Sequence, residues 1–359
     1  MKKIVCSALA ALSLTACASS NATYAHRLTA EQIAQMGPTP VSVTDNTLGI
    51  TTTWPQSNAA GSSFIPTNAA GGLGLLLVMG AEAWANADPQ RRANQTAEEF
   101  DAILPTEALN SALEQSFRSQ ITDPNDGFVT ISGVSRSLKY VAPGAINDTI
   151  EVVLFYQASD YSNVLRITGL ATYRDATGAQ IYNNMFTYYS AEILPPALSP
   201  ETTSTLLAAI NQRALRPTGV LPTSGTTAGV DYIRDTREAR DDFLTRAENG
   251  ILVTELWTRN DGALLRAEIA NAQALITRYV LLDINRPFDP AAVPGEEIIE
   301  TLPDGRTVHR IQTGFMIGTY EFRPAGSLSR AAFSNGMGIS RDQYNFNRWY
   351  QENPPAPAS

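Results

Sequence analysis

Histidine and cysteine are scarce in this chain, with two of each among 359 residues. A zinc site draws three or four ligands largely from these residue types, so the scarcity argues against one. The H-E-x-x-H, C-x-x-C and P-loop motifs are missing, and residues 133–137 (GVSRS) lack the second glycine of a nucleophile elbow. His309 is the histidine left for general-base catalysis, because His26 lies in a segment expected to be a linker. We therefore predict no catalytic residue, no metal and no cofactor.

Positive charge is also in short supply: 26 Lys and Arg face 35 Asp and Glu, for a formal net charge of −9 at pH 7. A chain of this charge repels nucleic acid phosphates and anionic headgroups, so we expect no nucleic acid partner. The charged fraction of 17% and the hydrophobic fraction of 43% are far from the composition of disordered chains. The composition therefore predicts a folded protein with a sizeable core.

The N-terminus carries the most informative pattern of the chain. Two lysines precede an apolar run over residues 4–14, and the run ends in Leu14-Thr15-Ala16-Cys17. A basic start followed by 7 to 15 apolar residues is typical of a signal peptide and is too short for a permanent transmembrane helix. Together with the cysteine, this segment resembles the signal peptide and lipobox of bacterial lipoproteins.

The resemblance implies export, removal of residues 1–16, and attachment of acyl lipid, palmitate included, to Cys17. Because Ala18 rather than aspartate follows Cys17, it also implies an outer-membrane anchor, with the protein facing the periplasm or the cell surface. Cleavage after Ala18, which would release an unlipidated protein, is the alternative. Loss of Cys6 with the signal peptide and acylation of Cys17 would leave no thiol for a disulfide.

The rest of the chain is predicted to fall into three parts. Residues 17–70 are rich in Ser, Thr, Asn, Ala and Pro and are expected to form a lipidated flexible tether, with a small hairpin or an added edge strand at residues 41–53. Residues 71–350 are expected to form a periplasmic domain with a sub-boundary near residues 195–230. Residues 351–359 form a Pro/Ala tail without core-forming side chains.

The predicted fold class is α+β: an antiparallel sheet packed by helices, with a helical pair and further C-terminal strands. The expected helices lie at residues 71–84, from a capping box at Thr96 and Glu99, from Thr106 with Leu109, Leu113, Phe117 and Ile121 on one face, at residues 204–215, after Asp235 and Glu238, and after Asp261 and Gly262. The last two form the expected pair. The expected strands lie at residues 149–157, 163–174, 181–190, 298–302, 307–313, 316–322 and 328–333.

Glycines and acids within these elements resemble parts of phosphate, calcium and hydrolase sites, but each match to the known motif is incomplete. Residues 71–84 lack the spacing of a phosphate loop and are too short to span a bilayer, which favours a buried helix. Asp123, Asn125 and Asp126 resemble the start of a calcium loop, but Val134 stands where a bidentate Glu is needed. The acids named for a two-carboxylate hydrolase lie on helices, where solvated faces are usual: Asp241, Asp242, Glu248, Glu255 and Asp261.

One strand carries a ladder of aromatic and amide side chains, which makes it the candidate binding surface: Tyr182, Asn184, Phe186 and Tyr188. If these side chains are exposed, the ladder would suit glycan stacking or protein contact. If they are covered, they belong to the hydrophobic core. We interpret the chain as a lipid-anchored cell-envelope protein that acts as a non-enzymatic adaptor, assembly factor or structural component. Its expected partners are the membrane, through the anchor, and envelope proteins or cell-wall glycan. The alternatives are a periplasmic hydrolase, which needs acids converging in a deep cleft, and a glycan-binding module.

Overall fold

The computed structural model describes residues 27–46, 48–52, 93–121, 131–137, 147–159, 162–242, 244, 246–287, 295–311 and 318–325. Four sets of predictions lie outside these residues: the lipobox cysteine, the glycine-rich segment at 71–84, the calcium-like sequence at 123–126, and the strand at 328–333 with the C-terminal tail. Within the described ranges, no helix has both the length and the apolar composition that crossing a membrane requires.

The molecule is built on one mixed sheet of nine strands, which confirms the α+β class. Its centre is antiparallel and consists of β4 (Thr149–Ala158), β5 (Leu165–Arg174) and β6 (Gln180–Tyr189). Side chains of β5 alternate between buried and half-buried positions, as the period of two in the sequence predicts. At the β5–β6 turn, Asp175 Oδ1 accepts hydrogen bonds from the Thr177 and Ala179 amides.

Strands from distant parts of the chain extend this centre on both sides. They are β1 (Thr39–Thr44), β2 (Ile50–Thr52), β3 (Ile131–Ser137), β7 (Glu296–Thr301), β8 (Thr307–Ile311) and β9 (Thr319–Arg323). The order is β3-β1-β4-β5-β6-β9-β8-β7, and β2 pairs with β4. The hairpin of β7 and β8 is confirmed, but β1 runs parallel to β3 and β4, and β9 runs parallel to β6. The sheet is therefore mixed, where local turn signals had predicted antiparallel pairs.

Part of the expected tether belongs to the core of this sheet, which corrects that prediction. Val41, Val43 and Ile50 are fully buried. β1 and β2 do not form a hairpin with each other, because both run parallel to β4. Threonine and valine suit a strand as well as a linker, and here polar groups find partners: the Thr51 hydroxyl donates to the Tyr156 carbonyl, 3.0 Å away. The Thr52 hydroxyl donates to the carbonyl of Ala93 at 2.6 Å.

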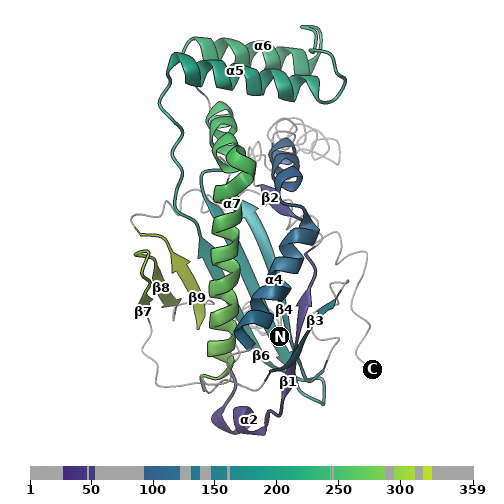
Figure 1. The fold of residues 1–359 in the computed structure, drawn as a ribbon, viewed down its shortest axis with the longest axis vertical. Helices are drawn as coiled ribbons and strands as arrows, with labels where there is room; N and C mark the ends of the chain where they lie inside the picture. The colour runs from purple at the N-terminus through teal and green to yellow at the C-terminus, as the bar shows by residue number, and fades with distance from the viewer. Residues whose placement is uncertain are drawn as a thin grey trace, which may run out of the picture.

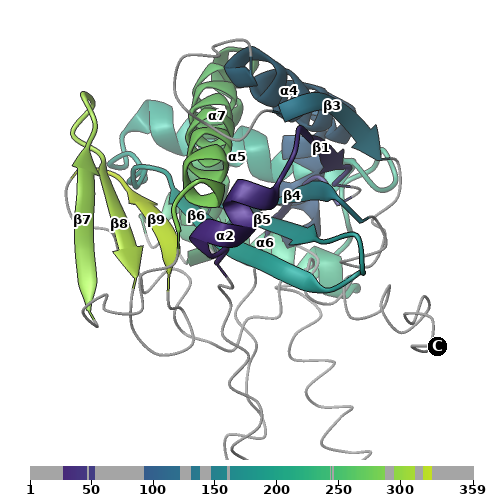
Figure 2. The same ribbon diagram turned by 90° about the horizontal axis from the view of Figure 1, so that it is seen from below.

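Helices cover one face of the sheet (Figures 1 and 2). They are a helical segment at 93–103, α4 (Thr106–Ile121) and α7 (Arg246–Ile284), while α2 (Ala30–Gln35) precedes β1. α4 packs against α7, β1 and β3, and α7 packs against β5 and β6. The predicted inward faces are confirmed by the burial of Leu109, Leu113, Phe117, Leu265, Ile269, Ala272 and Ile276.

Two predicted helix starts are wrong. Thr96 lies inside the segment at 93–103, so it does not cap a helix. Asp235 and Glu238 lie inside α6 (Thr227–Arg240), whose N-cap is Thr226. Short polar side chains favour helix starts but also occur within helices, so this signal is ambiguous.

The helix predicted after Asp261 and Gly262 is the second half of α7, which follows a break where Asn260, Asp261 and Gly262 all have positive φ values. Its predicted partner, a helix from Asp235 to about residue 249, is divided between the end of α6 and the first turn of α7, so the predicted pair is wrong. The real helical pair consists of α5 (Pro200–Leu215) and α6, which pack together at the N-terminal end of α7 (Figure 1). The first half of α7 completes a small apolar cluster with them, formed by Leu206, Ile210, Ala239, Ile251 and Leu252. The expected sub-boundary at 195–230 falls on α5 and its connection to α6.

Candidate functional site

The candidate binding ladder on β6 is buried, which corrects its prediction as a surface. Tyr182, Phe186 and Tyr188 have no exposed area, and Asn184 keeps 2%. These four side chains share one face of the strand, and α7 packs against β6. β9 continues the sheet beside β6. The ladder forms the junction between sheet and helix and is not available to a glycan.

Asp283, near the end of α7, organises the first half of this junction. Its Oδ2 accepts hydrogen bonds from the Tyr182 hydroxyl at 3.1 Å and from Asn184 Nδ2 at 2.6 Å. Its Oδ1 accepts from the Tyr320 hydroxyl at 2.8 Å and from Arg27 Nη2 at 2.6 Å. The carboxylate thereby joins α7 to β6, to β9 and to Arg27, which precedes α2.

Arg27 and Asp283 form a buried ion pair between residues 256 positions apart. Their side chains keep 5% and 0% of their area exposed. Arg27 Nη2 also donates to the Gly318 carbonyl at 3.2 Å and lies 3.1 Å from the Tyr320 hydroxyl. Breaking such a pair by removing one partner typically costs about 3–5 kcal/mol, because a charge stays buried alone.

The tyrosines of this cluster are placed as hydrogen-bond donors. Burial raises the pKa of the Tyr182 hydroxyl, and the charge of Asp283 raises it further. Burial and Asp283 likewise raise the pKa of Tyr320. Both hydroxyls therefore stay protonated near neutral pH, which suits a structural role and not general-base catalysis.

Phe186 and Tyr188, the other two residues of the ladder, contact β9, α7 and Arg306. The rings of Phe186 and Tyr320 stack with centroids 5.4 Å apart. The Tyr188 hydroxyl donates to Glu268 of α7. The Arg306 guanidinium lies over the Tyr188 ring, 4.2 Å from its centroid, a distance suited to a cation–π contact. Every predicted ladder residue thus has an internal partner.

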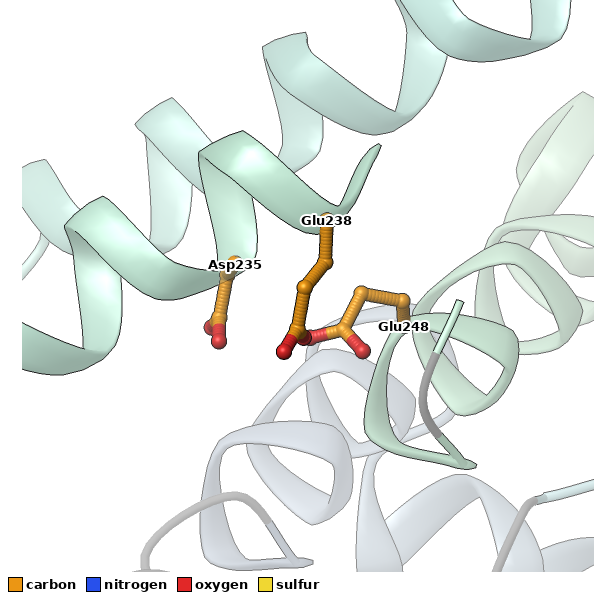
Figure 3. Close-up of side chains that lie close together, drawn as sticks. All are labelled: Asp235, Glu238 and Glu248. Carbon is orange, nitrogen blue, oxygen red and sulfur yellow. The ribbon is translucent and has the colours of Figure 1, made fainter. Parts of the chain in front are cut away.

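Three carboxylates converge elsewhere, at the junction of α6 and α7 (Figure 3). Asp235 and Glu238 come from α6 and Glu248 from the first turn of α7, and one oxygen of each lies within 4.8 Å of the others. Asp235 is 7% exposed and Glu248 is fully buried. Carboxylate oxygens are the ligands that hard divalent cations prefer, so this acidic triad has the composition of a cation site. Arg234 balances part of its charge, with Nη2 3.0 Å from Asp235 Oδ1.

A small pocket of about 60 Å³ adjoins this triad and shares Asp235 with it. Ile210, Arg213, Tyr232 and Ile251 also line the pocket. A buried water needs about 10–15 Å³ by this kind of measure, so the pocket has room for roughly four waters. Ligand sites typically enclose about 300–1,000 Å³. A glycan ring or a peptide is therefore too large for it.

The other acids named from the sequence stand apart from the acidic triad. Asp241 and Asp242 are exposed after α6, Glu255 pairs with Arg259 one turn later, and Asp261 is 85% exposed. None of them belongs to the one carboxylate cluster found among the described residues.

His309 is a packed strand residue. Its Nδ1 lies 2.8 Å from Glu296 Oε1, and its Nε2 lies 2.7 Å from the Thr307 hydroxyl. Burial lowers the pKa of the imidazole, and the neighbouring Arg323 lowers it as well. Its ring nitrogens are thus engaged by strand neighbours.

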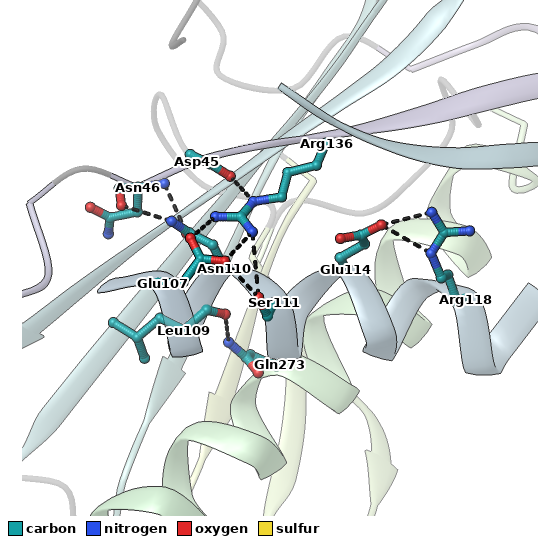
Figure 4. A network of polar contacts seen from close by, with 10 residues as sticks. All are labelled: Asp45, Asn46, Glu107, Leu109, Asn110, Ser111, Glu114, Arg118, Arg136 and Gln273. Atoms are coloured by element: carbon teal, nitrogen blue, oxygen red, sulfur yellow. Dashed lines mark hydrogen bonds and ion pairs between the residues drawn. The ribbon is translucent and has the colours of Figure 1, made fainter. Parts of the chain in front are cut away.

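A polar network that the sequence analysis missed fixes α4 to the edge of the sheet (Figure 4). Arg136 of β3 donates to Glu107 of α4 through Nη1 at 2.6 Å and Nη2 at 2.5 Å. It also binds Asp45, which follows β1. These hydrogen bonds lower the pKa of Glu107 to about 2. Nearby, Asn110 Nδ2 donates to the Asn46 carbonyl at 3.1 Å, and Asn110 Oδ1 accepts from the Asn46 amide at 3.0 Å.

No protein-family model, curated protein or solved structure matches this chain.

Proposed function

We propose that the protein is a lipid-anchored component of the bacterial outer membrane that acts as a non-enzymatic adaptor or assembly factor facing the periplasm. The lipobox-like tetrapeptide ending at Cys17 supports the anchor. The adaptor role rests on one feature of the fold, the α5–α6 helical pair, which we call the arm.

The arm carries apolar side chains that the molecule leaves exposed. Val230 and Ile233, one turn apart on α6, keep 57% and 51% of their area exposed. Leu215, Val220 and Leu221, at the end of α5 and after it, are exposed as well. The opposite side of α6 faces the small apolar cluster through Ala239. Exposed apolar residues grouped on a projecting element are typical of protein-binding surfaces.

The two alternatives lose support from the arrangement of the site. A glycan-binding module depended on the β6 ladder, whose residues are buried. A hydrolase depended on acids in a deep cleft, and the acidic triad adjoins a pocket of about 60 Å³. The arm is the surface that best fits a function through contact.

The test changes the arm without changing the anchor. A double variant, Val230→Asp with Ile233→Asp, should fail to complement a deletion strain, because it places charge on the proposed contact surface. The variant should remain folded and membrane-bound, because both positions are exposed and exposed substitutions change stability little. The matched control is the double variant Leu264→Asp with Ile298→Asp, which places the same two charges on apolar residues of α7 and β7 that are 43% and 60% exposed. The control should complement. Full complementation by the double variant would count against the arm as the contact surface and against the adaptor role built on it.

A further inference from the structure

The buried ion pair of Arg27 and Asp283 fixes Arg27 against the C-terminal end of α7. Arg27 follows Cys17 by only ten positions in the sequence. An extended chain spans at most about 3.3–3.6 Å per residue, so ten residues reach at most about 35 Å. The expected tether of more than fifty residues would have allowed several times that distance. Any lipid on Cys17 is thus held close to the point where Arg27 is fixed.

That point lies at one end of the molecule. Asp283 is next to the last residue of α7, and this end of α7 lies near α2 (Figure 1). The β5–β6 turn lies at the same end, because Val41 of β1 pairs with Ile150 and Ile150 pairs with Tyr173. We call this end, with α2 and the β5–β6 turn, the base.

The arm lies at the opposite end. Leu252 of α7 belongs to the same apolar cluster as Leu206 of α5 and precedes Asp283 by 31 positions. At 1.5 Å per helical residue this separation reaches roughly 45 Å, and the break at residues 259–262 shortens it somewhat. Figure 2, seen from below, has α2 near the viewer and the arm behind the rest of the molecule. Base and arm are thus separated by a distance comparable with the whole reach of the tether.

The negative net charge of the protein makes it unfavourable for the domain to lie flat on an anionic membrane surface. Removal of Lys2 and Lys3 with the signal peptide changes the formal charge from −9 to −11. Anionic headgroups repel a domain of this charge, and the repulsion grows with the area brought near the surface. An upright position keeps most of the acidic surface away from the headgroups.

We propose that the protein stands on the membrane with its base toward the lipid and its arm farthest from it, because the side chains of Arg27 and Leu28 are both buried at the base and only ten positions separate Arg27 from Cys17. This inference rests on the proposed lipid attachment at Cys17. It assigns the base to the lipid surface. It also directs the arm away from the membrane that holds the anchor.

Energy transfer to a dye on the lipid surface tests this orientation. In the mature lipidated protein Cys17 is blocked, so one introduced cysteine is a unique labelling site. Ala176→Cys labels the base and Ser204→Cys labels the arm, and both positions are exposed. In vesicles of phosphatidylethanolamine and phosphatidylglycerol, transfer from residue 176 should exceed transfer from residue 204 several-fold. Equal or greater transfer from residue 204 would overturn the orientation.

Two further variants test the role of the tether. Twenty Gly and Ser residues inserted between Ala25 and His26 add roughly 25 Å of root-mean-square reach, and should lower transfer from residue 176. Arg27→Met combined with Leu28→Ser should lower it too, because both buried attachments at this end of the chain are then removed. Unchanged transfer in the insertion variant would refute the short tether, even if the combined variant fails to fold.

Lipid attachment of the protein is measured in a separate experiment. Flotation of the unlabelled wild-type protein with the vesicles reports lipid attachment. A protein that does not float would refute the proposed anchor and this orientation with it. A protein that floats but has the wrong order of transfer would refute the orientation alone.

Discussion

Gln273 Nε2 lies 2.8 Å from the hydroxyl oxygen of Tyr156 and donates a second hydrogen bond, of 2.9 Å, to the carbonyl of Leu109. One amide group thus joins α7 to β4 and to α4, at a position that is 2% exposed. Gln273→Leu should lower the free energy of unfolding by about 1–3 kcal/mol, because the Leu109 carbonyl and the Tyr156 hydroxyl lose a buried partner. Urea unfolding followed by circular dichroism measures the change.

The matched control for this prediction is Gln120→Leu. Gln120 also donates to a backbone carbonyl, that of Ala274 at 3.0 Å, but this hydrogen bond is exposed to solvent. Water can replace it, so the control should stay within about 0.5 kcal/mol of the wild type. Equal losses in both variants would contradict a special role for the buried amide.

Gly262 is required by the break in α7. Its φ of +66° is unfavourable for any residue with a Cβ, and a Cβ there would lie 2.2 Å from Ile103 Cγ2. Gly262→Ala should therefore destabilise the protein by more than the roughly 1 kcal/mol that a left-handed residue alone costs.

Gly219→Ala separates the two contributions. Gly219 has a similar φ of +69°, but a Cβ there meets open space. This control should lose only the conformational part, about 1 kcal/mol. If both alanine variants melt at the same temperature, the contact with Ile103 does not matter.

The pair of Glu107 and Arg136 should make stability depend on pH in the acid range. Hydrogen bonds from Arg136 lower the pKa of Glu107 from 4.5 to about 2 in the folded protein. The carboxylate is the form that folding favours, so its contribution is complete above pH 4.5 and is lost as pH falls toward 2. Glu107→Gln should be less stable than wild type at pH 7, and the gap should close toward pH 2. The direction of this change is the test, because Glu107 is exposed and solvent weakens the pair.

His309 should contribute a pH dependence of its own. Burial lowers the pKa of its imidazole below 6.5, so the folded state favours the neutral ring. Stability gained this way is complete above pH 6.5 and falls as pH drops below that value. His309→Gln should flatten the slope of unfolding free energy between pH 7 and 5.

The same variant should complement a deletion strain, and complete loss of complementation by a folded protein would argue for catalysis.

Cys17→Ser should prevent acylation and lipoprotein processing, because the thiol is the group that accepts the lipid. Labelling with a fatty acid analogue and detergent extraction measure the loss. Cys6→Ser is the matched control, since that residue lies in the segment expected to be removed. A wild-type protein that carries no acyl chain would favour the released form instead.

Local patterns were sufficient to predict the parts of the fold that depend on near neighbours. The four-residue spacing from Leu109 to Phe117 predicts α4, and the alternation along residues 163–174 predicts β5. The turn at Pro303, Asp304 and Gly305 predicts the hairpin of β7 and β8. Each of these signals arises within about a dozen residues.

The contacts that the sequence could not predict join distant segments. Parallel pairing of β1 with β4 leaves no turn signal, because the strands are about a hundred residues apart. Strand β6 has aromatic residues on both of its faces, with Tyr189 on the face opposite the ladder, so only the position of α7 decides which face is covered. In the sequence, Asp283 is indistinguishable from a solvated acid at the end of a helix. Its role follows only from the contacts with Arg27, Tyr182 and Tyr320, which come from distant segments.

The hydrogen bond between Thr52 and Ala93 has a consequence for how this architecture can change over evolutionary time. It holds Thr52 and Ala93 side by side although 40 residues separate them in the sequence, so β2 and the helical segment at 93–103 are joined directly. Closing a loop costs only about 0.6 kcal/mol more for each doubling of its length. Reducing forty residues to five would thus save no more than about 2 kcal/mol. A change in the number of residues between positions 52 and 93 is therefore compatible with the registers of β2 and β4.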